Sequence, residues 1–197
     1  MRPKDENKEL AIRQKAIEMI ADRGLDGLSM QKLAKAAGVS PATLYIYYKD
    51  RDDLIVQLCV DETKRMFAAT LQDFHPDMSF AEGLRIQWLN RARFSVENKS
   101  SVAFTEQIRH SPYHCRAMQL IGTEMTDVLG QFVRNNIARG ELVPLPFEAY
   151  WSIAFSPLYQ LIKFHYQGRS FPNHEPFVLT EELLLQTMRM VLKALTP

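Results

Sequence analysis

The sequence has few of the residues that make tight turns or cross-links. Its 197 residues include 8 glycines and 2 cysteines. Scarce glycine argues against a β-rich fold with many tight turns and favours long helices. The cysteines, Cys59 and Cys115, are too few for a disulfide framework or a four-ligand metal site. We therefore expect reduced thiols, and we interpret Cys59 as a buried thiol, with a redox sensor as the alternative.

Long hydrophobic runs are missing as well. No stretch approaches the ~18 apolar residues that a membrane span requires, and the N-terminal residues 1–8 lack the apolar stretch of a signal peptide. Hydrophobic residues nevertheless make up 46% of the chain, which is enough to bury a sizeable core. We expect a soluble, cytoplasmic protein that has no membrane partner.

An excess of one charge is also lacking. The formal net charge is +1, from 24 basic and 23 acidic residues. A strongly basic balance would by itself have pointed to nucleic acid, and this chain does not have one. A nucleic-acid surface must therefore be a local feature of the chain.

Signatures of catalysis and metal binding are weak. The sequence contains no glycine-rich phosphate loop and no Gly-x-Ser-x-Gly motif. His110 and His114 have a spacing seen in helical metal sites, with Cys115 beside them. Pro112 lies between the two histidines and interrupts the helix that this spacing requires. We expect no metal, no cofactor and no enzymatic activity.

The spacing of apolar residues predicts an all-α chain of about nine helices. Glycine and small polar residues mark the helix ends: Gly24 follows the first helix, Ser40 caps the third, and Gly168 ends the penultimate one. We expect a three-helix unit in residues 1–52 and a larger helical domain in residues 53–197. The expected helices span residues 8–23, 29–37, 41–47, 50–72, 79–97, 101–110, 113–139, 147–167 and 180–195.

Residues 29–49 contain a helix, a glycine-containing turn and a second helix, which is the layout of a helix-turn-helix. Ala34 is small at a place where two helices must cross closely. Gly38 can adopt a positive φ in the turn, and we expect Val39 and Leu44 to fill the small core between the helices. The pattern predicts a DNA-binding unit.

The second helix of this pair carries candidate DNA contacts. Its N-terminal end is where base-edge contacts usually arise, and tyrosine hydroxyls and a lysine further along can donate to phosphates. The candidates for base contact are Pro41, Ala42 and Thr43, those for phosphate contact are Tyr45, Tyr47 and Lys49, and Ser29, Gln31 and Ser40 complete the predicted set.

The local charge agrees with this interpretation. Residues 27–49 contain Lys32, Lys35 and Lys49 and no aspartate or glutamate. A run of this length without acidic residues is expected on a surface that approaches a polyanion. The alternative is an ordinary helical hairpin whose tyrosines are there by chance.

The run AKAAGVSPATLYIYYKDRDDL, residues 34–54, resembles the DNA-binding signature of the tetracycline-repressor (TetR) family. The end of the first helix, residues 20–24, is similar as well, and the sequence likeness covers about residues 8 to 60. Beyond it, only the length and the helical architecture match. Ile46 and Tyr48 depart from the pattern, since many members carry an aromatic or polar residue and a phenylalanine there.

The resemblance implies a homodimeric regulator, usually a repressor, that binds a palindromic operator in double-stranded DNA. It implies that a small-molecule inducer binds in the C-terminal domain and releases the DNA. By position in the motif, Pro41, Ala42 and Thr43 face the bases, and Tyr45, Tyr47 and Lys49 hold the backbone. Activator and repressor both remain open, as do the operator and the ligand.

The C-terminal domain is dense in aromatic and methionine side chains, which either line a ligand cavity between helices or form a solid core. Because the resemblance implies a cavity, we name a candidate set in which Arg91 can orient a ligand among mostly apolar neighbours. The predicted ligand-binding residues are Trp88, Arg91, Phe104, Tyr113, Met125, Trp151, Phe155 and Tyr159.

The last two expected helices carry apolar residues on most sides, so we expect the penultimate helix to be buried all round. Such a pair suggests a two-fold interface in which two copies make a four-helix bundle, and the resemblance implies the same arrangement. The alternative is a pair of central helices in a monomer.

Two other functions are considered beside an inducer-controlled repressor. In one, the chain binds DNA but a partner protein biases the C-terminal domain. In the other, the chain is a helical enzyme with a passive helix-turn-helix, which should show a cluster of titratable residues. The sequence shows no such cluster.

Overall fold

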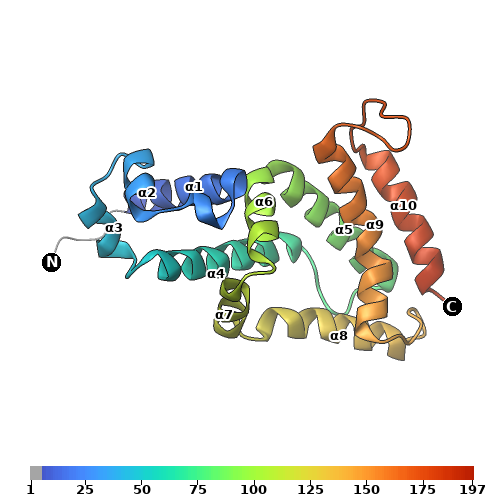
Figure 1. Ribbon diagram of the computed structural model, residues 1–197. Coiled ribbons are helices and arrows are strands. Elements are labelled where there is room, and N and C mark those ends of the chain that lie inside the picture. The colour runs from blue at the N-terminus through green and yellow to red at the C-terminus, as the bar shows by residue number, and fades with distance from the viewer. Residues whose placement is uncertain (1–5) are drawn as a thin grey trace. The chain divides into compact units, whose positions relative to one another are not determined.

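The computed structural model describes residues 6–197, except for the side chains of residues 124 and 125. This part of the chain folds into ten α-helices and contains no strand, which confirms the all-α class. The helices are α1 (Glu6–Arg23), α2 (Met30–Ala36), α3 (Pro41–Tyr47), α4 (Arg51–Thr70), α5 (Phe80–Glu97), α6 (Lys99–Ile108), α7 (Pro112–Ile121), α8 (Glu124–Ala138), α9 (Phe147–Gln167) and α10 (Glu181–Leu195), with a short 3-10 turn at Leu25–Gly27 (Figure 1).

The prediction of one long helix over residues 113–139 was wrong. The chain forms α7 and α8 there, separated at Gly122, whose φ of 76° and ψ of −176° leave the helical region. L side chains rarely adopt a φ of this sign, so glycine is the residue that permits the break. This division raises the number of helices from about nine to ten.

The chain divides into two compact units. Unit 1 comprises the described residues up to Met66 together with Asn98–Gly122, and unit 2 comprises Phe67–Glu97 and Thr123–Pro197. The predicted boundary between residues 52 and 53 lies near the start of α4, whereas the first segment of unit 1 continues along this helix to Met66. The functional division into a DNA-binding and a regulatory domain stays a prediction.

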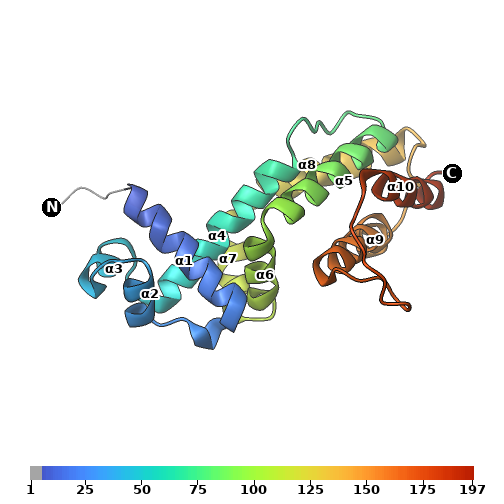
Figure 2. The same cartoon turned by 90° about the horizontal axis from the view of Figure 1, so that it is seen from above.

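The core of unit 1 lies between α1, the α2–α3 pair and the first part of α4. Ile12, Leu33, Leu44 and Leu54 are completely buried in it. A helix from later in the chain, α6, packs along α1 (Figure 2) and adds Phe104 to the same core. The predicted three-helix unit is thus completed by residues that lie beyond its predicted boundary.

The core of unit 2 is built from α5, α8, α9 and α10, and α9 and α10 lie side by side (Figure 1). Trp88 and Phe132 are among its most buried side chains. Gly83 on α5 allows α8 to approach, because a Cβ at this position would lie 2.3 Å from the Phe132 ring. This contact requires glycine unless the ring moves.

The expectation that α9 is buried all round was wrong for the single chain. Ile153 is 37% exposed and Tyr159 is 40% exposed, and on α10 Met190 is 61% exposed. The opposite side of α9, which includes Ala154 and Leu158, is buried in unit 2. The chain therefore presents an outer side of α9 and α10 that includes apolar residues.

Candidate nucleic-acid interface

The two helices of the helix-turn-helix are both closed by serine caps. The Ser29 hydroxyl accepts a hydrogen bond from the backbone N–H of Lys32 at the start of α2, and the Ser40 hydroxyl accepts one from the N–H of Thr43 at the start of α3, both at 3.2 Å. Gly38 has a φ of 67° in the turn between them. Each cap satisfies a donor that the helix itself leaves unpaired, so both helix starts are encoded locally.

The inner side of the pair is apolar and closely packed. Leu33 and Ala34 of α2 and Leu44 of α3 are buried, as are Tyr47 and Tyr48 at the end of α3. The Tyr48 hydroxyl is buried without a hydrogen-bond partner among the described residues. Because burial disfavours the phenolate, the pKa of Tyr48 lies well above its usual value. The observed role of Tyr48 is therefore packing in the core of unit 1.

The outer side carries most of the predicted DNA contacts. Gln31, Pro41, Ala42 and Lys49 are exposed, and Tyr45 is exposed over 56% of its surface. The three lysines of residues 27–49 are all exposed, and this stretch contains no carboxylate side chain. This stretch therefore brings no carboxylate of its own to a phosphate backbone. Asp50 and Asp53 follow it directly, and the Asp53 carboxylate accepts a hydrogen bond from the Lys49 backbone N–H at 2.8 Å.

Besides the capping serines Ser29 and Ser40, two further predicted DNA contacts, Tyr47 and Thr43, have structural roles. Tyr47 is only 8% exposed and belongs to the core of unit 1. Thr43 is half-buried, and its hydroxyl lies 2.9 Å from the Ser40 hydroxyl. The predicted phosphate contact from Tyr47 and base contact from Thr43 remain predictions, and Tyr45 offers a more accessible hydroxyl than Tyr47.

Arg51, at the start of α4, is a supporting residue that the sequence interpretation missed. Its Nε donates to the carbonyl of Leu28 at 3.0 Å and its Nη2 donates to the carbonyl of Leu25. Its Nη1 donates to the Tyr113 hydroxyl at 3.2 Å, and that hydroxyl donates to Asp52 at 2.7 Å. Arg51 thus ties the segment that enters α2 to α4 and α7.

No sequence signal identified Arg51, because its backbone acceptors lie 23 and 26 positions earlier in the chain. Through its hydrogen bonds with Arg51 and Asp52, Tyr113 has a structural role besides the predicted role in ligand binding. Its hydrogen bond to Asp52 raises the pKa of the Tyr113 hydroxyl, since the carboxylate accepts the phenolic proton.

The predicted ligand-binding residues fall into different units. Trp88, Arg91, Trp151, Phe155 and Tyr159 lie in unit 2. Phe104 and Tyr113 belong to unit 1, where Phe104 is a core residue, and the side chain of Met125 lies outside the described residues. Their roles in ligand binding remain predictions. The five residues in unit 2 can be considered together, because they lie in one compact unit.

Within unit 2, Arg91 on α5 contacts several of these residues. Its Nε donates to Gln87 Oε1 at 3.1 Å and its Nη1 donates to the Tyr159 hydroxyl at 2.9 Å. The guanidinium carbon lies 4.7 Å from the ring centre of Phe155 and 5.2 Å from that of Trp151. Arg91, Trp151, Phe155 and Tyr159 therefore form one cluster between α5 and α9.

Trp88 has a different setting from the rest of the predicted set. It is completely buried, and its indole N–H donates to the carbonyl of Ala154 at 2.8 Å. This bond satisfies its one polar group and links α5 to α9. Its observed role is therefore packing between the two helices.

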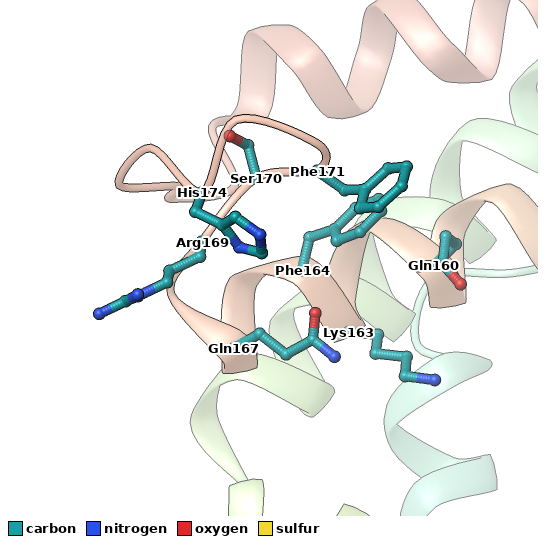
Figure 3. Close-up of a pocket in the computed structure, with 8 residues that line it drawn as sticks. All are labelled: Gln160, Lys163, Phe164, Gln167, Arg169, Ser170, Phe171 and His174. Carbon is teal, nitrogen blue, oxygen red and sulfur yellow. The ribbon is translucent and has the colours of Figure 1, made fainter.

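A groove of about 520 Å³ lies at the end of α9 and the segment that follows it (Figure 3). In Figure 3 the side chains of Phe164, Phe171 and His174 lie toward the middle of the groove, and that of Arg169 points away from it. None of the predicted ligand-binding residues whose side chains the structure describes lines it. The lining residues are Gln160, Lys163, Phe164, Gln167, Arg169, Ser170, Phe171 and His174.

Among the residues that the structure describes, no group of three or more His, Cys, Asp or Glu side chains is placed to hold a metal ion. Within the same residues, no helix has the length and apolar character needed to cross a membrane.

The helix-turn-helix and the segments around it match known regulators. Residues 12–58 match the sequence model of a family described as bacterial regulatory proteins, tetR family. An uncharacterized HTH-type transcriptional regulator from Haemophilus influenzae is 38% identical over 95 residues, which cover 48% of this chain and 50% of that protein. The chain thus spans about half the length of this curated relative.

Two solved structures match over nearly the whole chain. A TetR family transcription regulator from Marinobacter aquaeolei has a TM-score of 0.85 and 29% identity, covering 99% of this chain and 98% of its own. A TetR family protein from Vibrio parahaemolyticus has a TM-score of 0.78 and 25% identity, covering 96% and 99%. These matches are to a family of transcriptional regulators and not of enzymes. Residues 12–58 therefore carry the N-terminal sequence pattern of the tetR family of bacterial regulatory proteins, and the whole chain shares its fold with solved TetR family regulators.

Proposed function

We propose that this protein is a homodimeric repressor that binds a palindromic operator and is released from it by a small molecule bound in the C-terminal domain. The observation that carries the proposal is the exposed side of α2, α3 and the residues that follow α3, which carries Lys32, Lys35 and Lys49, while residues 27–49 contain no acidic residue. A helix-turn-helix places its second helix in the major groove, and a dimer does so twice, with half-sites about 34 Å or more apart.

The proposed contacts with DNA are of two kinds: phosphate contacts, which position the protein, and base contacts, which select the sequence. Lys49 and Tyr45 are exposed near the end of α3 and donate to phosphates, which fixes the position of the protein on the duplex. Pro41 and Ala42 are exposed at the start of α3 but offer no side-chain donors. Base readout there relies on apolar contact with thymine methyl groups and on DNA shape, with Thr43 as the polar contributor.

The proposed dimer forms through α9 and α10. Their outer side in the single chain includes Ile153, Tyr159 and Met190, each more than a third exposed. A second copy related by a two-fold axis covers such residues with the same two helices, which gives a four-helix bundle. Burial of this apolar surface supplies the main driving force for association.

Release of the operator is a shift between two states of the dimer. The ligand acts only if it binds the state that cannot bind DNA more tightly than the state that can. We place its site in unit 2, where Arg91, Trp151, Phe155 and Tyr159 cluster.

The proposal is tested by enrichment from a pool of random DNA duplexes with the purified full chain. The expected result is a two-fold symmetric consensus whose half-sites lie about one helical turn or more apart, since two copies of α3 read the same sequence in opposite directions. Recovery of no consensus, or of an asymmetric one, would contradict the proposed dimeric mode of binding.

A further inference from the structure

Arg91 is a buried cation whose charge the described part of the chain does not neutralise. The residue is 3% exposed, and none of the ion pairs among the described residues involves it. Its Nη2 is buried and has no hydrogen-bond partner among the residues that the structure describes. Removing a cation from water costs several kcal/mol unless an anion compensates it, so an incoming anion gains much at this place.

The other donors of this guanidinium are held in place. Nε donates to Gln87 Oε1, and the Gln87 amide group is itself anchored, because its Nε2 donates to the carbonyl of Thr70 at 2.9 Å. Nη1 donates to the Tyr159 hydroxyl. Since these partners are neutral, they satisfy hydrogen bonds without balancing the charge. The guanidinium is thus oriented in advance, and one nitrogen is left for a further acceptor.

The surroundings of the guanidinium are aromatic. The rings of Phe155 and Trp151 lie within 5.2 Å of its central carbon, and their own centres are 4.6 Å apart. Cation–π attraction offsets part of the charge but supplies no hydrogen-bond acceptor in the plane of the guanidinium. These rings also offer an apolar surface to the body of a ligand.

We propose that Arg91 binds the carboxylate group of a small, largely apolar molecule, which gives a chemical class to the ligand in the proposed function. Nη2 donates to one carboxylate oxygen. The Tyr159 hydroxyl, whose oxygen accepts from Nη1, has no acceptor among the described residues and donates its proton to the other oxygen. The apolar body of the molecule packs on Trp151 and Phe155.

The single charge of Arg91 favours a carboxylate over a phosphate dianion. One buried cation neutralises one carboxylate, whereas a dianion would bring a second, uncompensated charge into the same apolar setting. Tyr159 is 40% exposed and Trp151 is half-buried, so they are the members of the cluster nearest to solvent. Because the partner covers Tyr159 in the proposed dimer, the molecule reaches Arg91 past the half-buried Trp151 side chain.

Isothermal titration of the full chain with benzoate, octanoate and decanoate, each beside its uncharged primary amide, tests the proposal. At least one acid should bind about tenfold or more tightly than its amide, because a charge-assisted hydrogen bond contributes about 1.5–3 kcal/mol. Arg91→Gln should abolish this difference between acid and amide, and Tyr159→Phe should reduce it. Arg93→Gln, which changes an exposed arginine of the same helix, should preserve it.

Equal binding of acids and amides, no binding of any of the three acids, or an unchanged preference in Arg91→Gln would overturn the carboxylate site. Helical content by circular dichroism verifies that each variant is folded, and Tyr159→Phe is a second test because it removes one hydroxyl without altering a buried charge. The titration contains no DNA, so its failure is distinct from a failure of the proposed operator binding.

Discussion

Arg51 in unit 1 and Arg91 in unit 2 are both held by hydrogen bonds, but only Arg51 has a carboxylate nearby. Arg51 donates to two backbone carbonyls and to Tyr113, and its Nη1 lies 3.6 Å from Asp52. Within the described part of the chain, Arg91 donates to neutral groups alone and keeps Nη2 unpaired. The first arrangement is complete within the chain and stabilises the support of the helix-turn-helix. The second leaves a charge for a ligand to neutralise.

The outer surfaces of the units differ in a related way. In unit 1 the outer side of α2 carries Lys32 and Lys35, and Lys49 follows α3, as expected for a polyanionic partner. In unit 2 the outer side of α9 and α10 includes exposed Ile153 and Met190. Different partners are therefore expected for the two units, DNA for the first and a second copy of the chain for the second. The following experiments test this contrast.

Met190→Asp should have the largest effect, on dimerisation. A carboxylate on each copy at an apolar two-fold contact is desolvated without a partner, so we expect the dimer Kd to rise by about a hundredfold or more. Sedimentation equilibrium measures the change. Val96→Asp is the matched control, since Val96 is an exposed apolar residue on α5. If the two variants dimerise equally well, the interface lies elsewhere.

Arg51→Ala should destabilise unit 1. It removes the donors to the Leu25 and Leu28 carbonyls and to the Tyr113 hydroxyl, so we expect a loss of about 2–4 kcal/mol in the free energy of unfolding. Urea denaturation followed by circular dichroism measures it. Arg116→Ala, at an exposed position of α7, should stay within about 0.5 kcal/mol of the parent. Equal losses of unfolding free energy in both variants would show that Arg51 stabilises the protein no more than an exposed arginine does.

Arg91→Met should cost less stability than Arg51→Ala, which is the direct comparison of the two arginines. The lost hydrogen bonds are offset by removal of a buried cation without a carboxylate partner, so we expect a change within about 1 kcal/mol. The same urea denaturation applies. A loss as large as that of Arg51→Ala would mean that the protein itself already compensates the charge of Arg91.

Lys49→Ala should weaken DNA binding to a similar degree on every sequence. Because a phosphate contact is lost, the slope of log K against log salt should become shallower by about 1. Fluorescence anisotropy over a range of salt concentrations measures the slope. Lys64→Ala changes an exposed lysine of α4 and serves as the control. An unchanged slope for Lys49→Ala would contradict a phosphate contact.

Tyr45→Phe should have the smallest effect and tests the importance of exposure within α3. Loss of one hydroxyl contact to DNA is expected to cost about 1 kcal/mol of binding free energy. Tyr47→Phe should cost less DNA affinity, since Tyr47 is 8% exposed whereas Tyr45 is 56% exposed. The same anisotropy titration compares them. The reverse order would place the Tyr47 hydroxyl, and not that of Tyr45, on the DNA.

Features that depend on neighbouring residues could be predicted from the sequence. The bounds of α3 were predicted as the structure has them, because a serine cap and a proline at the first helical position act within four residues. The break between α7 and α8 was missed, although Gly122 lies there. A single glycine is tolerated inside a helix at a cost of about 1 kcal/mol, so the residue alone does not decide between a break and a continuous helix.

Features that depend on distant residues could not be predicted from a single sequence. The carbonyl partners of Arg51 and the packing of Phe104 against unit 1 both join segments that are remote in the chain. For Tyr47 a signal was present. Leu44, Tyr47 and Tyr48 stand at positions i, i+3 and i+4, which is the spacing of one helix face. Since Leu44 was predicted to be buried, the same face indicates burial of Tyr47.

The central claim is that DNA binds the exposed side of α2, α3 and the residues that follow α3, and a charge-matched comparison tests it most directly. We would measure the Kd for the enriched duplex of a variant with Lys32, Lys35 and Lys49 changed to glutamine. Its control carries glutamine at Lys64, Lys163 and Lys193, which are also exposed. The first variant should bind roughly a hundredfold more weakly than the parent at about 0.1 M salt, while the control should bind nearly as well as the parent. Equal weakening in both variants would show that net charge, and not this surface, governs the binding.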